Sequence, residues 1–373
     1  MRIKLLSPLL VGGRKLTGQL MESLPYIPGE VFKAAVARYI AKNCVVPVKE
    51  KQNWVSFQNQ RECSQCPLAD LCRDFPSLSF SNGYPILAGK KVLEPAPLTA
   101  RVCKYNGSHR LFDSLKTLIH NTEVGECPDC LEQKEEKVRT ERAKGFMYRD
   151  KESKAYFPAS LIKYYRYLTR TAIDPYRQVA ADGQLYTMKV LDGDLEFEFY
   201  ALGGVEALSP GMELQVGGRL TYGYGRVEVV RVDRADGDSP EAVLRRLEKF
   251  NKKEGPVFIP LLLVSDLLPG NRALEEIFQE VCPEGEIHCR YLETSWWRGF
   301  DTSGWAEKRK PLELRVNMGS VVVLAVPREA VTEELVRRLV EQGFAGVGEK
   351  REWGYGRFRV MHPVHLAEGG KRQ

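Results

Sequence analysis

Val216-Gly-Gly-Arg-Leu-Thr-Tyr-Gly-Tyr-Gly-Arg-Val-Glu-Val229 recurs without gaps as Val347-Gly-Glu-Lys-Arg-Glu-Trp-Gly-Tyr-Gly-Arg-Phe-Arg-Val360. Seven of the fourteen positions are identical, and three more pairs, Arg219/Lys350, Tyr222/Trp353 and Val227/Phe358, keep charged, aromatic or apolar character. The two copies start 131 residues apart, which is too far for a solenoid and indicates a duplicated domain. Their glycines, aromatics and cations suit a loop that lies against a nucleic-acid backbone. The alternative is a tight turn that only leads into a strand.

Both glycine-rich loops supply candidate RNA contacts: cations for phosphates, aromatics for stacking on bases, and glycines that let the backbone approach. Because it carries Trp353 and the additional Arg351, the second loop is the better candidate. The candidate residues are Gly217, Gly218, Arg219, Tyr222, Gly223, Tyr224, Gly225 and Arg226 in the first loop and Gly348, Lys350, Arg351, Trp353, Gly354, Tyr355, Gly356 and Arg357 in the second.

A third candidate segment interleaves cations with aromatics in Lys163-Tyr-Tyr-Arg-Tyr-Leu-Thr-Arg170. If this segment is helical, Lys163, Arg166 and Arg170 share one face and reach phosphates while the tyrosines stack on bases or pack. An amphipathic element with its tyrosines turned inward is the alternative of equal weight.

The chain's size and composition indicate two domains and an insertion. At 373 residues it is too long for one ordinary core, and 43% of its residues are hydrophobic. No apolar run approaches the 18 residues or so of a membrane span, and no secretory signal opens the sequence, so we expect a cytoplasmic protein. The net charge of +6 is too small to indicate nucleic acid by itself.

The C-terminal third, residues 255–373, predicts a complete α+β domain. Its apolar runs and helical spacings follow the order β-α-β-β-α-β, with the second glycine loop placed before the last strand. This is the order of ferredoxin-like or RRM-type domains. The predicted elements are strands at 257–264, 286–293, 320–326 and 357–361 and helices at 271–281 and 332–341.

The N-terminal part, residues 1–235, starts in the same way. A strand at 2–6 precedes a turn at 25–29 and a helix at 30–42, and a hairpin turns around Asp192-Gly193. Between about 44 and 150 the periodicity is lost, so we expect a second ferredoxin-like unit that carries a large insertion. Residues 236–254 are expected to be a linker.

Cysteines concentrate in this insertion. In a cytosolic chain, two C-x-x-C pairs suit a structural zinc–thiolate site better than a set of reduced thiols. We predict Cys63, Cys66, Cys127 and Cys130 as ligands, with Cys72 and Cys103 as substitutes and a further site completed by His109 or His120 as an open alternative. The expected buried hydrophobes are Cys44, Cys282 and Cys289, and His362 and His365 are expected in an exposed tail.

Several segments of the chain resemble the RAMP superfamily of CRISPR effector subunits. Gly343-Phe-Ala-Gly-Val-Gly-Glu-Lys350 with Trp353–Arg357 is similar to the glycine-rich loop of that family, and Ile27-Pro-Gly29 to its N-terminal signature. Thr169–Asp174 with Asp182–Tyr186 resembles the segment that approaches guide RNA in backbone subunits. Together with Pro97–Lys104 and the inserted cysteines, these features resemble the Csx-type subunit (Cas-five group) of type III-D complexes.

The resemblance implies a role in antiviral defence as a subunit that binds the repeat-derived 5′ handle of a CRISPR RNA. Its partners would be the large polymerase-like subunit and the RAMP backbone subunits, with target RNA nearby and no membrane. Family members that process precursor RNA generally place a histidine on or near the first helix, and residues 30–42 contain none. Backbone subunits that cut target RNA carry an aspartate before the Pro-Tyr-Ile-Pro-Gly turn, and Gly18–Leu24 contains none.

These two departures favour a non-catalytic subunit, and the sequence offers no Walker loop, no H-E-x-x-H and no G-x-S-x-G motif. The alternatives are an endoribonuclease that processes precursor CRISPR RNA, a backbone subunit that cuts target RNA, and a protein–protein adaptor whose loops only close the sheet.

Overall fold

The structure is a computed structural model in which two compact units are formed by interleaved parts of the chain. Unit 1 comprises Met1–Lys90 and Ser160–Arg234, and unit 2 comprises Lys91–Ala159 and Ala235–Gln373. The residues that the structure describes are 1–12, 15–17, 20–44, 63, 65–87, 91–135, 138–174, 176–204, 208–233, 237–298, 300–301, 308–309 and 311–370.

Unit 1 is built around an antiparallel sheet whose central strand is β1 (Arg2–Leu5). β1 alternates half-buried and buried residues, as expected for a strand with one face in a core. Within unit 1, the strands of this sheet follow the order β5-β14-β1-β17-β16. Their bounds are β5 Tyr84–Leu87, β14 Glu196–Glu198, β17 Arg226–Arg231 and β16 Glu213–Gln215.

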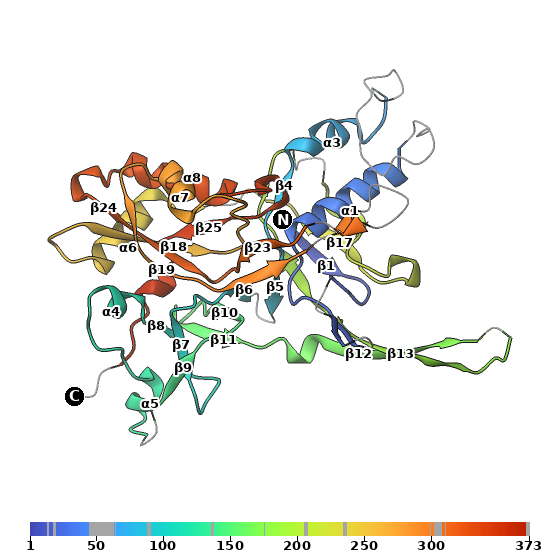
Figure 1. The fold of residues 1–373 in the computed structure, drawn as a ribbon, viewed down its shortest axis with the longest axis horizontal. Helices are drawn as coiled ribbons and strands as arrows, with labels where there is room; N and C mark the ends of the chain where they lie inside the picture. Colours follow the sequence, from blue (N-terminus) through green and yellow to red (C-terminus); the bar gives the residue numbers. More distant parts are fainter. Residues whose placement is uncertain are drawn as a thin grey trace. The chain divides into compact units, whose positions relative to one another are not determined.

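The helix α1 (Gly29–Lys42) lies on this sheet and forms the core of unit 1 with it (Figure 1). Pro28 fixes an extended backbone just before the first turn, and Phe32, Val36 and Ile40 recur at helical spacing on the buried face. Phe32 packs against Phe80 and Phe199 with ring centroids 5.0 and 4.5 Å away. Smaller elements complete this part: α3 Ala69–Asp74, η1 Phe75–Ser77, β4 Ser79–Phe80 and β15 Ala201–Leu202.

A long hairpin of unit 1 carries the cation–tyrosine segment. The hairpin pairs β12 (Tyr165–Ile173) with β13 (Ala180–Leu191) (Figure 1). On its other side, β13 pairs with β3 (Leu20–Glu22), and β3 pairs with β2 (Lys15–Thr17). The helical interpretation of residues 163–170 is therefore wrong: only η2 (Ile162–Tyr164) is helical, as a single turn. Aromatic and β-branched residues pair well across such a hairpin, which favours the strand.

Unit 2 contains the predicted order of strands and helices. Strand β18 (Val257–Leu263) is followed by α7 (Leu274–Val281), β19 (Glu286–Tyr291), β24 (Val321–Val326), α8 (Glu333–Ala345) and β25 (Phe358–Val360). The antiparallel sheet has the order β19-β24-β18-β25. The predicted start of α8 is confirmed, because the side chain of Thr332 accepts a hydrogen bond from the backbone N–H of Leu335.

The two sheets share one order when their strands are numbered along each unit. The four strands are, in chain order, β1, β5, β14 and β17 in unit 1 and β18, β19, β24 and β25 in unit 2. In both sheets the second of these strands pairs with the third, the third with the first, and the first with the fourth. In unit 1, the described residues between β14 and β17 form short strands and the turn η4 (Leu220–Tyr222) where unit 2 has α8.

Most of the expected insertion packs with the C-terminal unit instead of the first domain. Leu115 belongs to the same buried cluster as the β18 and β24 side chains, and the His120 imidazole lies 3.1 Å from the carbonyl oxygen of Phe250. The backbone N–H of Leu98 donates to the carbonyl of Gly319 at 2.8 Å. Hydrogen bonds and apolar burial therefore anchor residues 91–159 in unit 2.

Segment 91–159 and its surroundings contribute the remaining elements of unit 2. One three-stranded arrangement runs β11-β10-β6, another β8-β7-β9, and the pairs β20·β23 and β21·β22 are separate. The bounds are β6 Lys91–Pro95, β7 Ala100–Cys103, β8 Phe112–Asp113, α4 Leu115–Ile119, α5 Pro128–Glu132, β9 Thr140–Arg142, β10 Phe146–Arg149, β11 Tyr156–Ala159, β20 Thr294–Trp297, β21 Phe300–Asp301, β22 Lys308–Arg309, β23 Glu313–Val316, η5 Arg328–Ala330, η6 Arg351–Trp353 and η7 Pro363–Leu366.

Two further expectations are wrong in unit 2. The stretch 236–254, expected to be a linker, contains the helix α6 (Pro240–Phe250), whose Val243, Leu247 and Phe250 are buried in the core. The tail after β25 is buried as well: His365 lies against the carboxylate of Asp113 with neither side chain exposed, and the His362 imidazole lies 3.0 Å from Glu94. Burial lowers the pKa of His362 to about 4 despite the neighbouring Glu94.

None of the described helices combines the length and the apolar character that a membrane span requires.

Candidate functional site

The two glycine-rich loops have the same backbone conformation. Arg219 and Lys350, at equivalent positions, both adopt the left-handed region with φ of 58° and 55°. Each is followed by a single 3-10 turn, η4 or η6, that ends at a glycine with positive φ. The duplication seen in the sequence is therefore also a duplication of local structure.

A second repeat, shorter and missed by the sequence analysis, holds both loops in place. Ser7-Pro-Leu-Leu10 follows β1, and Ser265-Asp-Leu-Leu268 follows β18. Leu10 and Leu268 accept backbone N–H groups from Gly218 and Glu349, both at 2.8 Å, and the hydroxyls of Ser7 and Ser265 accept from Arg226 and Arg357 at 2.9 and 2.8 Å. The shared Ser-x-Leu-Leu pattern was the signal that could have revealed it.

The glycines at the end of each loop are required by the protein's own backbone. A Cβ on Gly225 would lie 1.9 Å from the carbonyl oxygen of Val216, and a Cβ on Gly356 would lie 1.9 Å from that of Val347. Both residues also have positive φ, near 70°. Their presence is thus explained by close packing of the loop, independently of any RNA.

Aromatic residues of the loops divide into an exposed and a buried pair. Tyr222 is 69% exposed and Trp353 is 37% exposed, whereas Tyr224 and Tyr355 keep 6% and 8%. The rings of Tyr224 and Tyr355 are therefore packed within their own units, and only the first pair offers a face on which a base could stack.

Arg357 is also buried, with 2% of its surface exposed. Burial lowers the pKa of its guanidinium to about 10. The predicted contact of this side chain with phosphate does not agree with its position, although its counterpart Arg226 is exposed and forms an ion pair with Glu213 at 2.9 Å.

In unit 1, the first loop and the hairpin form a surface of cations and tyrosines, which we call the Arg219 surface: Arg170, Tyr186, Arg219 and Tyr222. The Arg219 guanidinium lies over the Tyr186 and Tyr222 rings at 5.6 and 5.7 Å from their centroids. Arg170 is exposed on β12 directly opposite Tyr186, and a side-chain hydrogen bond with Tyr224 raises the pKa of its guanidinium.

The two other predicted cations of this segment are less closely associated with the loop. Arg166, on the same face of β12 as Arg170, forms an ion pair with Asp192 at 3.1 Å, and Lys163 lies over the ring of Tyr164. Both are exposed.

In unit 2, the corresponding cation is already neutralised. The Lys350 ammonium forms an ion pair with Glu313 at 2.7 Å and lies over the Trp297 ring at 4.8 Å. The Tyr355 ring packs edge-on against the same tryptophan. Exposed groups remain at this loop in Arg351 and Trp353.

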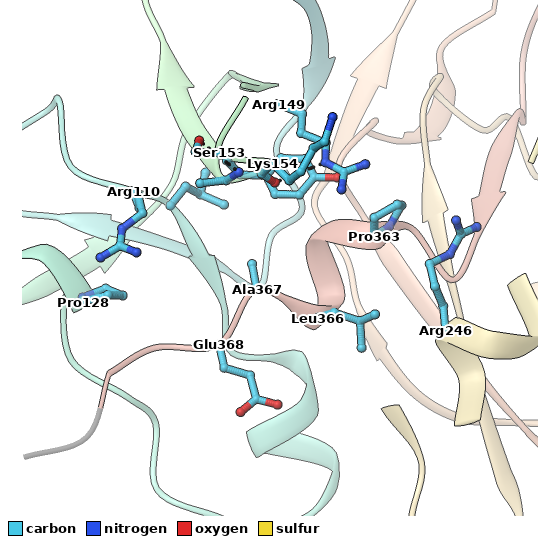
Figure 2. Close-up of a pocket in the computed structure, with 13 residues that line it drawn as sticks. Arg110, Pro128, Arg149, Ser153, Lys154, Arg246, Pro363, Leu366, Ala367 and Glu368 are labelled. Carbon is cyan, nitrogen blue, oxygen red and sulfur yellow. Dashed lines mark hydrogen bonds between the residues drawn. The ribbon is translucent and has the colours of Figure 1, made fainter. Parts of the chain in front are cut away.

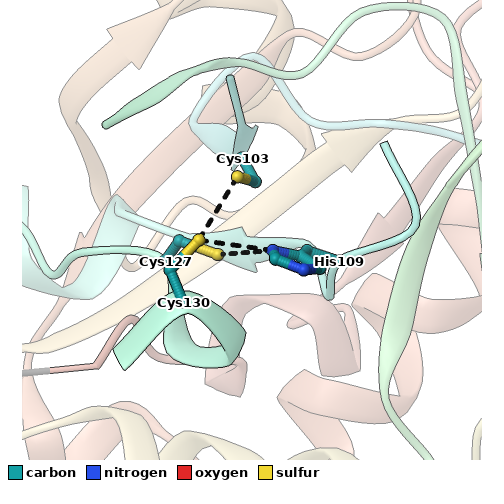
Figure 3. Close-up of side chains that lie close together, drawn as sticks. All are labelled: Cys103, His109, Cys127 and Cys130. Atoms are coloured by element: carbon teal, nitrogen blue, oxygen red, sulfur yellow. Dashed lines mark hydrogen bonds between the residues drawn. The ribbon is translucent and has the colours of Figure 1, made fainter. Parts of the chain in front are cut away.

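A candidate metal centre lies in unit 2, where Cys103, His109, Cys127 and Cys130 converge (Figure 3). All four side chains are buried and their ligand atoms lie within 4.8 Å of one another. Cys103 Sγ is 3.5 Å from Cys130 Sγ, and His109 Nδ1 is 3.5 and 3.4 Å from the sulfurs of Cys127 and Cys130. Tetrahedral zinc with its usual bond lengths requires edges of about 3.8 Å between sulfurs and about 3.6 Å between sulfur and nitrogen.

The local structure explains this convergence. Cys103 ends β7, and Cys127 precedes α5, so that one helical turn brings Cys130 to the same side. His109 is held from behind by the Asn106 amide, 2.9 Å from Nε2, and the next residue, Arg110, pairs with Asp129 inside the Cys127–Cys130 turn. Three sulfurs and one imidazole can bind a metal ion such as zinc.

Burial and hydrogen bonding act differently on the three thiols. Burial raises the pKa of Cys127 and of Cys130. At Cys103 burial acts in the same direction, but hydrogen bonds from the backbone of Tyr105 and Asn106 and with the two other thiols together lower the pKa.

The ligands that converge differ from the predicted set. Cys127 and Cys130 are present, the substitute Cys103 is included, and His109 completes the group, whereas Cys63 and Cys66 belong to unit 1. Position along the chain could not reveal this, because it depends on how residues 91–159 fold. Cys282 is buried as predicted, Cys289 is half-buried, and Cys44 is exposed, contrary to the prediction.

A cavity of about 460 Å³ in unit 2 is bordered by four cations, Arg110, Arg149, Lys154 and Arg246 (Figure 2). Arg110 is paired with Asp129 and Glu132, and Arg246 with Asp238 at 3.2 Å. Glu368 also borders the cavity. Acidic groups thus already balance much of this positive charge.

Two of the solved structures that are similar to this chain come from type III CRISPR complexes. A chain of the type III-B Cmr-beta complex bound to cognate target RNA and AMPPnP is 15% identical over 97% of this chain and 99% of that one, with a TM-score of 0.46. A chain of the Csm3–Csm4 subcomplex of the type III-A CRISPR-Cas interference complex is 13% identical over 89% of this chain and 96% of that one, with a TM-score of 0.32.

The curated proteins offer no match to the sequence. The RAMP superfamily model, in contrast, matches residues 2–228, which include β1, α1, the hairpin and the first glycine-rich loop up to Glu228. This chain belongs to the RAMP superfamily.

Proposed function

We propose that this protein is a non-catalytic subunit of a type III CRISPR effector complex. In this proposal it binds the 5′ repeat-derived handle of the CRISPR RNA and anchors the large subunit and the backbone subunits. Membership of the RAMP superfamily supports the general role, and the Arg219 surface beside the first glycine-rich loop supports RNA binding.

The Arg219 surface has the chemistry of a single-strand binding site. A cation held between two tyrosine rings, with Arg170 close by, can neutralise phosphates while the exposed Tyr222 stacks on a base.

Charge pairing favours the first loop over the second as the main handle contact. Lys350 is neutralised by Glu313, and Arg357 is buried, so two cations of the second loop are committed within the protein. In the first loop Arg226 is likewise paired with Glu213, but Arg219 is exposed and lies over two tyrosine rings. The sequence favoured the second loop because of Trp353 and Arg351, which remain exposed and could contribute a secondary contact.

Replacing Tyr222 by alanine is expected to weaken binding of handle RNA by roughly 5- to 150-fold, because a base–aromatic stack contributes about 1–3 kcal/mol. Fluorescence anisotropy with a labelled repeat-derived RNA measures this change. Trp353→Ala, at the equivalent position, should have the smaller effect. Tyr200→Ala, which removes a tyrosine of unit 1 with 44% exposure, serves as the control and should bind normally. Unchanged affinity for Tyr222→Ala would remove the first loop from the RNA interface.

The same RNA separates the proposed role from its alternatives. Site-specific cleavage of labelled repeat RNA, with or without divalent metal, would identify a processing endoribonuclease and overturn the non-catalytic role. A protein–protein adaptor would show no salt-sensitive RNA binding. Sequencing the RNA that co-purifies from the host should give a shared 5′ tag on otherwise different RNAs if the handle is the ligand.

We also infer that Cys103, His109, Cys127 and Cys130 hold a structural zinc ion. Three thiolates and one imidazole fill a tetrahedral shell, and all four residues are buried, which leaves no open position for catalysis.

A further inference from the structure

Four cysteines of unit 1 lie outside the centre described above. Cys44 follows α1 by two residues, Cys63 and Cys66 form a C-x-x-C pair, and Cys72 lies in α3. The backbone N–H of Cys66 donates to the carbonyl of Cys63 at 3.2 Å, so this pair forms a tight turn. One helical turn then follows, in which the N–H of Cys72 donates to Leu68 at 2.9 Å.

Packing places α3 against α1. Cys72 contacts the same buried core as Tyr39 and Ile40, which lie in the last turns of α1. Lys33 of α1 donates to the carbonyl of Pro76 at 3.3 Å and lies over the Phe75 ring, directly after α3. Cys44 lies two residues after the end of α1, next to the last turns of the helix, which share this core with Cys72.

The electrostatics of the four thiols agree with this placement. Burial raises the pKa of the Cys72 thiol, and the charges of Cys44, Cys63 and Cys66 raise the same pKa further.

We propose that Cys44, Cys63, Cys66 and Cys72 form a second zinc site, with four thiolate ligands. The C-x-x-C turn supplies two sulfurs to one ion, and α1 and α3 each supply one. Their ligand atoms are spread more widely than the Cys103 group, which alone among the described residues has its atoms within 4.8 Å. Rotation of the four cysteine side chains would be needed to bring their sulfurs within bonding distance of one ion.

Such a site would join the end of α1 to α3 and to the Cys63–Cys66 turn. It shares no ligand with the centre of unit 2, and it does not depend on RNA binding. Each unit would then be stabilised by its own structural zinc ion.

Metal content of the purified full-length chain tests this proposal. The wild-type protein is expected to contain two zinc ions per chain, and Cys63→Ser/Cys66→Ser and Cys127→Ser/Cys130→Ser one each. Cys44→Ser should release zinc to a chromophoric chelator faster than wild type, and Cys44→His, which keeps a metal ligand, should retain it. Cys289→Ser, outside both groups, is the control and should keep two ions.

Cobalt replacement identifies the ligands even if a serine variant folds poorly. The wild-type chain should show sulfur-to-cobalt charge transfer from both sites, and Cys44→His should change the d–d bands of one site only. One zinc ion in the wild type, lost in Cys127→Ser/Cys130→Ser, would overturn the proposal. So would a cobalt spectrum that does not respond to Cys44→His, or disulfides in place of metal among these four cysteines under reducing conditions.

Discussion

Replacing Cys127 and Cys130 together by serine is expected to abolish zinc binding in unit 2 and to unfold most of residues 91–159. Serine supplies no thiolate, so two of the four ligands disappear, and Cys103 and His109, which are buried in the intact protein, are too few to hold the ion. The binding free energy of a structural zinc ion is on the order of 10–16 kcal/mol, comparable to the entire stability of a domain. Limited proteolysis with mass spectrometry should therefore show new cleavage within this segment, which the wild-type protein resists.

A matched control removes two cysteines of the same unit that are not part of the centre. Cys282→Ser/Cys289→Ser should retain the ion and lose only the roughly 1–3 kcal/mol that burial of a hydroxyl costs. Adding a strong chelator to the wild-type chain should reproduce the cleavage pattern of Cys127→Ser/Cys130→Ser. If the double variant keeps both its zinc and its protease resistance, the group is a set of buried thiols and no metal centre.

The fold of the C-terminal part could be predicted because its patterns are strong. Val257–Leu263 and Val321–Val326 are uninterrupted apolar strands, and α8 begins at a threonine cap with two glutamates in its first turn. The helix α6 was missed although Val243, Leu247 and Phe250 recur at helical spacing, because the surrounding charges were interpreted as a linker.

What could not be predicted depends on contacts between distant parts of the chain. The sequence places the cysteines in one insertion, but the protein divides them between two units because Leu115, His120 and Asp113 pack against the C-terminal core and tail. Likewise, Tyr222 and Tyr224 are separated by one glycine, and only the fold shows that one ring is exposed and the other buried.

Gly225→Ala is expected to destabilise unit 1 by about 3–4 kcal/mol. A left-handed backbone costs a residue with a Cβ about 1–2 kcal/mol. The Cβ would also lie 1.9 Å from the Val216 carbonyl oxygen, and the shift that relieves this clash weakens two backbone hydrogen bonds of 2.8 Å, Val216 N–H to Gly225 and Gly225 N–H to Pro8, each contributing about 1 kcal/mol. Urea denaturation of the variant and the wild-type chain measures the difference.

Gly223→Ala, two residues earlier in the same loop, separates the cost of a left-handed backbone from the cost of a Cβ that clashes with the protein's own backbone. Gly223 has φ of 83°, but a Cβ there meets no atom within 4 Å, so its replacement should cost only the 1–2 kcal/mol or so of the backbone conformation. If RNA approaches this open side, Gly223→Ala should lower affinity more than its small loss of stability explains, since a methyl group would hold the phosphates away. Equal stability losses for the two variants would contradict the packing argument for Gly225. Normal RNA binding by Gly223→Ala would leave the glycines with a purely structural role and confine recognition to side chains such as Arg219 and Tyr222.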